Sequence, residues 1–348
     1  MKTPSTVLLF IKLSVLLTLL YISCSDQTEK GEQKSGSTTI QILPLQGEIA
    51  AKKSEISGLA WYKEQLIILP QYPDRFSKNG AAALFRIPKE DLLAYIDGKT
   101  KEEFDPVRIE FDDRSIGDSI DGFQGYEAIQ FNGNKVYLLI EADNDGVMSA
   151  YVVEGSLGEE PYRLDLDPSS LRSLTMPVNL DNFAYESLVI AGDTLFSFYE
   201  ANGININPEA YAIGYNIQTG DTLIVPFPTI EYRITDATSL DEKNNLWVIN
   251  YFWPGESQIL SPGTDSLLIR SDSTVYFSNS GSVERLLELH FTGSRFELTQ
   301  TDPIYLSQDS KGESRNWEGI VKLDDIGFVI ATDKHPRTIL AFVSRDKN

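Results

Sequence analysis

Polar side chains that could carry chemistry recur in pairs, with the two members of each pair fourteen or fifteen residues apart. The first member precedes a small or short residue and an apolar run, and the second member follows the next apolar run. The pairs are Ser57/Gln71, Glu127/Glu141, Glu186/Glu200, Asp236/Asn250 and Glu318/Asp333. Most of these residues are carboxylic acids, so the pattern predicts that acids gather wherever the pairs meet.

The chemistry of such a cluster of acids follows from the charge of its carboxylates. Carboxylates a few ångströms apart cannot all stay ionised without compensation. A calcium ion is one solution, because it takes roughly six to eight oxygen ligands. We therefore predict a calcium site formed by Glu127, Glu141, Glu186, Glu200, Asp236, Asn250, Glu318 and Asp333. The alternative is that these acids accept hydrogen bonds from backbone amides of neighbouring repeats and hold the repeats together.

Basic and aromatic side chains stand close to these acids in the sequence. We predict that a ligand is bound by four of them: Arg233, Arg315, Lys334 and Trp253. The three basic residues would suit an anionic ligand such as a phosphoester or carboxylate. Ion pairs with the acids and packing between repeats are the alternatives. Conventional nucleophile motifs are missing, the chain has two histidines, and the sequence assigns no catalytic residue.

The elements that must position the pairs are short strands. Each pair brackets two apolar segments separated by a turn, as in an antiparallel hairpin. The start of the first strand and the end of the second lie at the same end of such a hairpin. Repeated hairpins of this kind predict an all-β fold, a single β-propeller whose innermost strands bring all the pairs to one mouth of a central channel.

We expect five blades. The N-terminal segment Thr39–Leu43 would supply the outer strand of the last blade and close the ring, which removes free strand edges. Lys89–Ile96 is the best helical segment. The long gap from Asn250 to Ser282 is either an inserted loop or a sixth blade with strands at residues 267–269 and 274–277.

Two short motifs carry a resemblance. Glu55-Ile56-Ser57-Gly58-Leu59-Ala60-Trp61 and Trp317-Glu318-Gly319-Ile320 resemble the repeat signature of the bacterial propellers called SdiA-regulated, and of the related phytase-like, esterase-like propellers. The resemblance implies an exported propeller that binds calcium. Gly is replaced by Ala128, Ser187 and Ala237 in the other three repeats.

The N-terminus predicts export. Lys2 and Lys12 precede a short apolar run that ends at Ser23-Cys24, a pattern that resembles the lipobox of bacterial lipoproteins. Cys24 is the only cysteine and is the expected site of lipid attachment. We expect a signal peptide at residues 1–23, a flexible tether at 24–38 and the propeller at 39–348. The protein would then be anchored in the cell envelope, on the outside of the inner membrane or on the outer membrane.

The net charge of −21 argues against nucleic-acid partners and anionic lipid surfaces. We expect a monomer that touches the membrane through its lipid alone and that binds a small molecule or an envelope component. The first functional hypothesis is a binding module with a calcium-stabilised mouth. The second is a metal-assisted phosphoesterase. The third is a glycosidase that uses two of the ring carboxyl groups.

Overall fold

The computed structural model describes residues 37–345 apart from 53, 160, 271–280 and 308–313. The predicted signal peptide and almost all of the predicted tether, including Cys24, lie outside the described residues. Ser37–Thr38, the last two residues of the predicted tether, form a short strand, β1, that pairs with β20 (Ile304–Leu306). Within the described ranges, no helix has the length and apolar character needed to cross a membrane.

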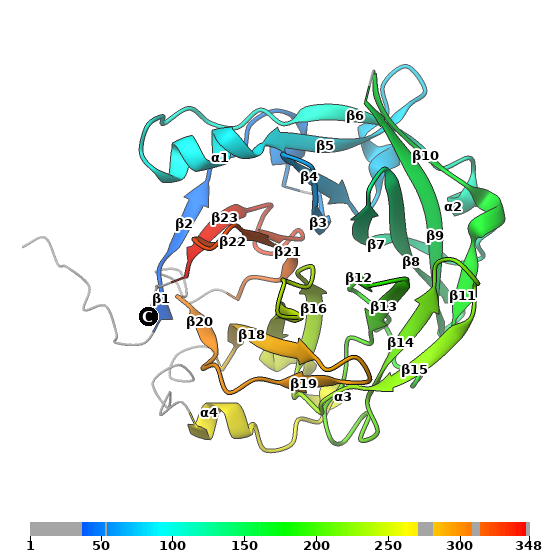
Figure 1. Cartoon of the computed structure of the whole chain (residues 1–348), viewed down its shortest axis with the longest axis vertical. Helices are drawn as coiled ribbons and strands as arrows, with labels where there is room; N and C mark the ends of the chain where they lie inside the picture. Colours follow the sequence, from blue (N-terminus) through cyan, green and yellow to red (C-terminus); the bar gives the residue numbers. More distant parts are fainter. Residues whose placement is uncertain (1–36, 53, 160, 271–280, 308–313, 346–348) are drawn as a thin grey trace, which may run out of the picture. The chain divides into compact units, whose positions relative to one another are not determined.

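The described chain is mostly β and has the arrangement of a β-propeller (Figure 1). The strands of the first antiparallel set are β3 (Ile56–Tyr62), β4 (Gln65–Pro70), β5 (Ala82–Pro88) and β6 (Val107–Asp112). The second set contains β7 (Phe123–Asn132), β8 (Lys135–Asn144), β9 (Val147–Glu159), β10 (Tyr162–Leu166) and β11 (Arg172–Leu174). A parallel pairing of β6 with β10 joins the outer edges of these two sets.

Three further sets follow along the chain. The third contains β12 (Val189–Ala191), β13 (Thr194–Phe198), β14 (Tyr211–Asn216) and β15 (Thr222–Pro226). The fourth contains β16 (Arg233–Ala237), β17 (Asn245–Phe252), β18 (Val283–Phe291) and β19 (Phe296–Leu298), together with β20 and β1. The fifth contains β21 (Trp317–Leu323), β22 (Gly327–Thr332), β23 (Leu340–Ser344) and the N-terminal β2 (Ile40–Leu43).

Helices are short and lie in the connections between strands. They are η1 (Glu48–Ala50), η2 (Pro73–Phe76), α1 (Lys89–Ile96), α2 (Ile116–Ser119), η3 (Pro168–Ser170), η4 (Pro254–Glu256), α3 (Ser257–Leu260) and α4 (Ser266–Arg270). The predicted helix over Lys89–Ile96 is confirmed as α1. A strand at residues 267–269 was expected if a sixth blade existed; that expectation is wrong, because α4 occupies those residues. The other strand of that alternative, 274–277, falls outside the described residues.

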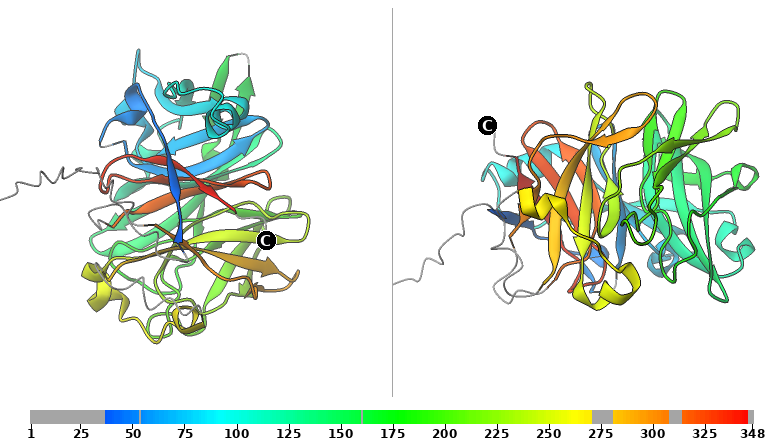
Figure 2. Two further views of the ribbon diagram at one scale, coloured as in Figure 1. Left: turned by 90° about the vertical axis from the view of Figure 1, so that its left-hand side faces the viewer. Right: turned by 90° about the horizontal axis from the view of Figure 1, so that it is seen from below.

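The first strands of the sets stand around a common centre (Figure 1). β3 contacts β7 and β21, β7 contacts β12, and β16 contacts β21. A bridge between Ala201 and Arg233 links the third set to the fourth. The predicted pairing of the N-terminal strand with the last strand is present, since β2 runs antiparallel to β23, and Figure 2 shows the two side by side.

The core consists of five apolar clusters, and each one combines side chains from at least two neighbouring sets. Representative pairs of buried members are Ile67 with Ile140, Tyr137 with Ile213, Phe198 with Leu289, Ile249 with Ile330, and Leu59 with Val329. Each strand set is therefore apolar on both faces, as face-to-face packing of successive sheets requires. Rigid packing on both faces fixes the position of the inner strand ends, where the polar pairs lie.

A β-bulge occupies the same place in four of the five sets. The register shifts between the first and second strands leave Ser57, Glu127, Thr235 and Glu318 without a partner in the ladder. A bulge turns the side chain of the extra residue away from the regular alternation. In the fourth set the bulged residue is Thr235, so the predicted alignment of Asp236 with Glu127 and Glu318 is wrong by one position.

The second member of the fourth pair shifts in the same way. Glu141 is paired with Gly125, two residues before the bulged Glu127, and Tyr251 is paired with Arg233, two residues before Thr235. Tyr251 therefore stands where Asn250 was expected. Both errors have one cause: Asp236-Ala237 imitates the acid–small dipeptide of the other repeats, and only the hydrogen-bond register separates them.

Candidate functional site

A pocket of about 570 Å³ is lined by two of the bulged residues, Glu127 and Glu318. Its lining includes Glu127, Glu141, Glu186, Glu318 and Asp333 from the predicted set, together with the predicted Arg233, Lys334 and Trp253. Glu200 lies directly behind the lining, in contact with Arg233. The structure thus brings together most of the acids that the repeats predicted, at one end of the hairpins.

Among the described residues, neither Glu127 nor Glu141 of the lining forms an ion pair with a basic side chain. Both are buried, and Gln71 Nε2 donates a hydrogen bond of 2.8 Å to Glu127 Oε1. Burial, followed by the charges of Glu141 and Glu186, raises the pKa of Glu127 well above its usual range. Burial and the charge of Glu186 raise the pKa of Glu141 to about 7, against the opposing effect of Arg233. This pair therefore retains a proton at pH values where an ordinary glutamate is ionised.

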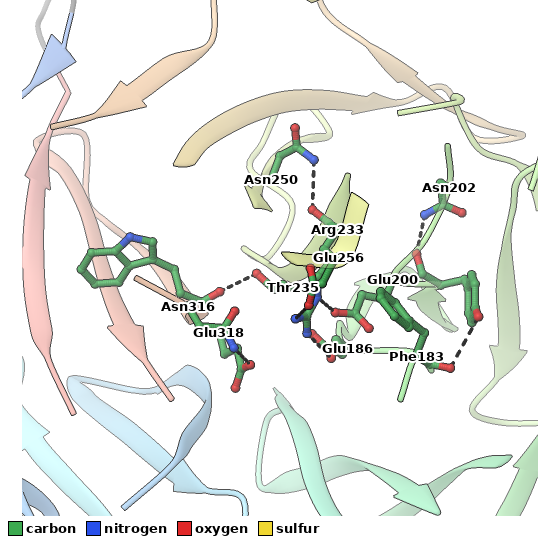
Figure 3. A network of polar contacts seen from close by, with 12 residues as sticks. Phe183, Glu186, Glu200, Asn202, Arg233, Thr235, Asn250, Glu256, Asn316 and Glu318 are labelled. Atoms are coloured by element: carbon green, nitrogen blue, oxygen red, sulfur yellow. Dashed lines mark hydrogen bonds and ion pairs between the residues drawn. The ribbon is translucent and has the colours of Figure 1, made fainter. Parts of the chain in front are cut away.

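Arg233 also belongs to the pocket lining, and Figure 3 shows it among its carboxyl partners. Its guanidinium is buried and contacts three carboxyl groups: Glu200, Glu186 at 3.4 Å and Glu256 at 3.1 Å. Burial disfavours its charge, but these carboxylates outweigh burial and hold the pKa of Arg233 well above its usual range.

One guanidinium cannot neutralise three carboxylates, and the acids respond differently. Burial raises the pKa of Glu200 well above the usual range despite its bond to Arg233. Burial also raises the pKa of Glu186, while the charge of Arg233 and hydrogen bonds from Glu200 and Arg233 act in the opposite direction. Glu186 is therefore a lining carboxyl group whose ionised form Arg233 favours and burial opposes.

The fifth strand set contributes a second acidic pair, Glu318 and Asp333. Burial and the charge of Asp333 raise the pKa of Glu318 well above its usual range. Asn316 Nδ2 donates to Glu318 Oε1, and the backbone N–H of His335 donates to Asp333 Oδ1 at 2.6 Å. His335 and Lys334 complete this side of the lining, and Lys334 Nζ lies 3.4 Å from Glu55 Oε1.

Three predicted site residues are not brought to the pocket. Asp236 accepts bonds of 2.7 Å from the backbone N–H groups of Ala237 and Ile320, and the second of these joins β16 to β21. Asn250 donates to the carbonyl oxygens of Glu231 and Arg233 and accepts from Arg285. For these two residues the structure has the alternative arrangement, hydrogen bonding that holds the chain together.

Arg315 is the third of these residues. Its guanidinium is buried against Glu284, with N···O distances of 3.0 and 2.8 Å, and stacks on the Trp317 ring. It does not line the pocket. The ion pair that the sequence left as an alternative is therefore present, although with Glu284, an acid outside the repeat pattern.

Aromatic rings border the pocket at Tyr251 and Trp253. Tyr251 is buried, whereas Trp253 is 51% exposed although it belongs to the lining. The Trp253 ring lies directly over Gly255, where a Cβ atom would come within 2.1 Å of the ring. An exposed indole held in place at a pocket edge can stack on the apolar face of a sugar.

Several lining residues escaped the sequence reasoning. Glu256 belongs to η4, after the end of β17, and Asn182 and Ser314 lie in loops. Asn316 stands two residues before the bulged Glu318. This spacing is the signal that could have identified Asn316. Arg233, which the sequence did predict, also stands two residues before a bulged residue, Thr235.

Calcium remains a prediction. In the part of the chain that the structure describes, no three histidine, cysteine or acidic side chains are grouped as a metal site. Glu127, Glu141, Glu318 and Asp333 are the oxygen ligands that line the pocket away from Arg233 and could take such an ion.

No protein-family model matches the sequence, and no curated protein matches it. The resemblance to SdiA-regulated and phytase-like propellers therefore has no family match behind it. Solved structures are similar in fold. A glycosyl hydrolase from Bacteroides ovatus is 10% identical, with 90% of this chain and 95% of that chain covered and a TM-score of 0.49.

Two other solved structures match comparably. One comes from the GH130 family of mannoside phosphorylases, described as containing glycoside hydrolases that target β-1,2 mannosidic linkages in Candida mannan. It is 9% identical, with 90% and 96% of the two chains covered and a TM-score of 0.47. The other, a thermostable family-43 glycoside hydrolase, is 10% identical, with 87% and 91% covered and a TM-score of 0.44. At such identities the likeness concerns the fold alone.

Proposed function

We propose that the chain is a glycosidase whose chemistry is carried by the carboxyl groups of the pocket. The observation that carries the proposal is the contrast between two carboxyl environments in one opening. Glu127 and Glu141 share buried surroundings without a direct cation partner, whereas Glu186 is bonded to Arg233. Glycoside cleavage needs one protonated and one ionised carboxyl group flanking the scissile bond.

The roles follow from these surroundings. The Glu127–Glu141 pair donates its proton to the departing glycosidic oxygen as the bond from that oxygen to the anomeric carbon breaks. The ionised Glu186 either takes a proton from the attacking water or attacks the anomeric carbon itself. Arg233 favours the ionised form of Glu186 against the effect of burial, and it orients the carboxyl group. Trp253 offers an apolar surface to a sugar ring.

The architecture proposed with this function is a five-bladed propeller closed by β2. The five strand sets and the β2–β23 pairing support it. We also propose export and anchoring through Cys24, which would place the pocket in the cell envelope.

The test is a screen of the purified protein for release of sugar from neutral and charged glycosides, followed by kinetics of variants. Glu127→Gln and Glu186→Gln should each lower kcat by about 100-fold or more, which is typical for loss of a general acid or base. Glu209→Gln, at an exposed position outside the pocket, is the matched control and should leave kcat unchanged. Equal activity of all three variants would reject the proposal.

A further inference from the structure

The charge of the pocket lining restricts which glycosides can enter. Six carboxyl side chains line it, from Glu127, Glu141, Glu186, Glu256, Glu318 and Asp333. The basic side chains of the described lining are Arg233, Lys334 and His335. Arg233 is already bonded to three carboxyl groups, and Lys334 lies 3.4 Å from Glu55, outside the lining. A ligand that brings its own negative charge would meet excess acid and no uncommitted guanidinium.

Unpartnered atoms give a second, independent indication. Asn316 Oδ1 and Glu256 Oε2 are buried and have no hydrogen-bond partner among the described residues. Asn316 is only 9% exposed, lies in the lining and donates a hydrogen bond to Glu318 (Figure 3). Both atoms are hydrogen-bond acceptors. Among the described lining residues, no buried hydrogen-bond donor lacks a partner. A buried acceptor without a donor is unfavourable, so a bound ligand that supplies donors is favoured.

A protonated amine meets both conditions. It carries one positive charge and three N–H donors, and it has no acceptor atom. A sugar hydroxyl donates one hydrogen bond but brings no charge, and a carboxylate or phosphate brings acceptors of the wrong charge.

We propose that the pocket selects amine-bearing glycosides, with the ammonium group of an amino sugar seated among Glu256, Asn316 and Glu318. This inference rests on the proposed glycosidase function and names its substrate class. Trp253, 51% exposed at the same opening, is available to stack on the sugar ring.

Proton exchange should accompany the binding of such a ligand. A cation favours the ionised form of nearby carboxyl groups, and the pKa of Glu141 starts at about 7. Binding of an ammonium sugar near pH 7 should therefore release protons from the pocket. Binding of the neutral sugar of the same shape should release none.

The experiment compares glucosamine, glucose, N-acetylglucosamine and glucuronate by isothermal titration calorimetry with the full chain, at a pH where the amine is protonated. Glucosamine should bind at least about 10-fold more tightly than the two neutral sugars, and glucuronate more weakly than either. Added salt should reduce this preference, because it screens charge. Repeating the titration in buffers of different ionisation enthalpy measures the protons released.

A variant pair tests the location. Glu256→Gln should reduce the preference for glucosamine over glucose, while Glu209→Gln should retain it. Equal binding of glucosamine and glucose, or tighter binding of glucuronate, would overturn the inference.

Failure of this inference can be told apart from failure of the proposed function. Cleavage of neutral glycosides without any preference for amines would leave the glycosidase proposal standing and reject the amine. A clear preference for glucosamine without cleavage of any glycoside would support the ligand class and count against the enzyme.

Discussion

Replacing Glu141 by Gln should change the pH dependence of stability in a defined direction. Burial and Glu186 raise the pKa of Glu141 from 4.5 to about 7 in the folded protein. Between these two values the unfolded chain has lost the proton and the folded chain has kept it. Stability therefore falls as pH rises through this window, and the full penalty is present above pH 7.

The magnitude follows from the same two values. At about 1.4 kcal/mol per pKa unit, a rise from 4.5 to about 7 corresponds to about 3.5 kcal/mol. Glutamine has nearly the same shape and cannot ionise, so Glu141→Gln should remove this penalty. Relative to the unchanged protein, the variant should gain about 3.5 kcal/mol of unfolding free energy at pH 8 and close to none at pH 4.5.

The assay is urea denaturation of both proteins at a series of pH values from 4.5 to 8. Glu209→Gln serves as the control, because its side chain is exposed and should not alter the pH profile. A stability difference between Glu141→Gln and the unchanged protein that is the same at every pH would refute the reasoning. A stability advantage of the variant that shrinks as pH rises would refute it as well.

Three further predictions address other parts of the account. Gly255→Ala should raise KM for a glycoside several-fold with little change in kcat, because a Cβ there would displace the Trp253 ring; an unchanged KM would show that this ring does not hold the sugar. Arg315→Met should lower the unfolding free energy by about 3–5 kcal/mol, since it leaves Glu284 buried without its cation. If urea denaturation showed no such loss while ligand binding disappeared, Arg315 would be a ligand-binding residue after all. The predicted calcium site should give a higher melting temperature with added Ca²⁺ than with EDTA, by mass action on the folded state, and identical melting curves would contradict it.

The repeat pattern predicted where the acids would meet because hairpin geometry follows directly from strand–turn–strand spacing. Glu127, Glu186 and Glu318 came to one pocket for that reason. The pattern could not reveal the β-bulge, since a bulge is set by hydrogen-bond register. Thr235 and Asp236 are adjacent in the sequence, and the repeat pattern alone does not show which of them is the bulged residue.

The difference is also visible in the contacts between strand sets. Ser57 Oγ donates to the carbonyl of Tyr126, the residue before Glu127, and Thr235 Oγ1 donates to the carbonyl of Trp317, the residue before Glu318. The hydroxyl group of the bulged residue in one set thus bonds to the backbone next to the bulged acid of the following set. Such a relation joins residues 69 and 82 positions apart, beyond the reach of local patterns.

Glu256 shows a second limit of the sequence. It lies in η4 and contacts Arg233, from a segment that no repeat describes. Residues outside a repeat have no regular spacing in the sequence. Their membership of a site can therefore be recognised only once the fold is known.

The central claim is that the Glu127–Glu141 pair delivers a proton to a departing glycosidic oxygen. The most direct test compares substrates whose leaving groups differ in their need for that proton. We predict that Glu127→Gln cleaves an alkyl glycoside at least about 100-fold more slowly than the unchanged protein, while it cleaves the dinitrophenyl glycoside of the same sugar at nearly the normal rate. Equal losses on both substrates, or no loss on either, would contradict the account.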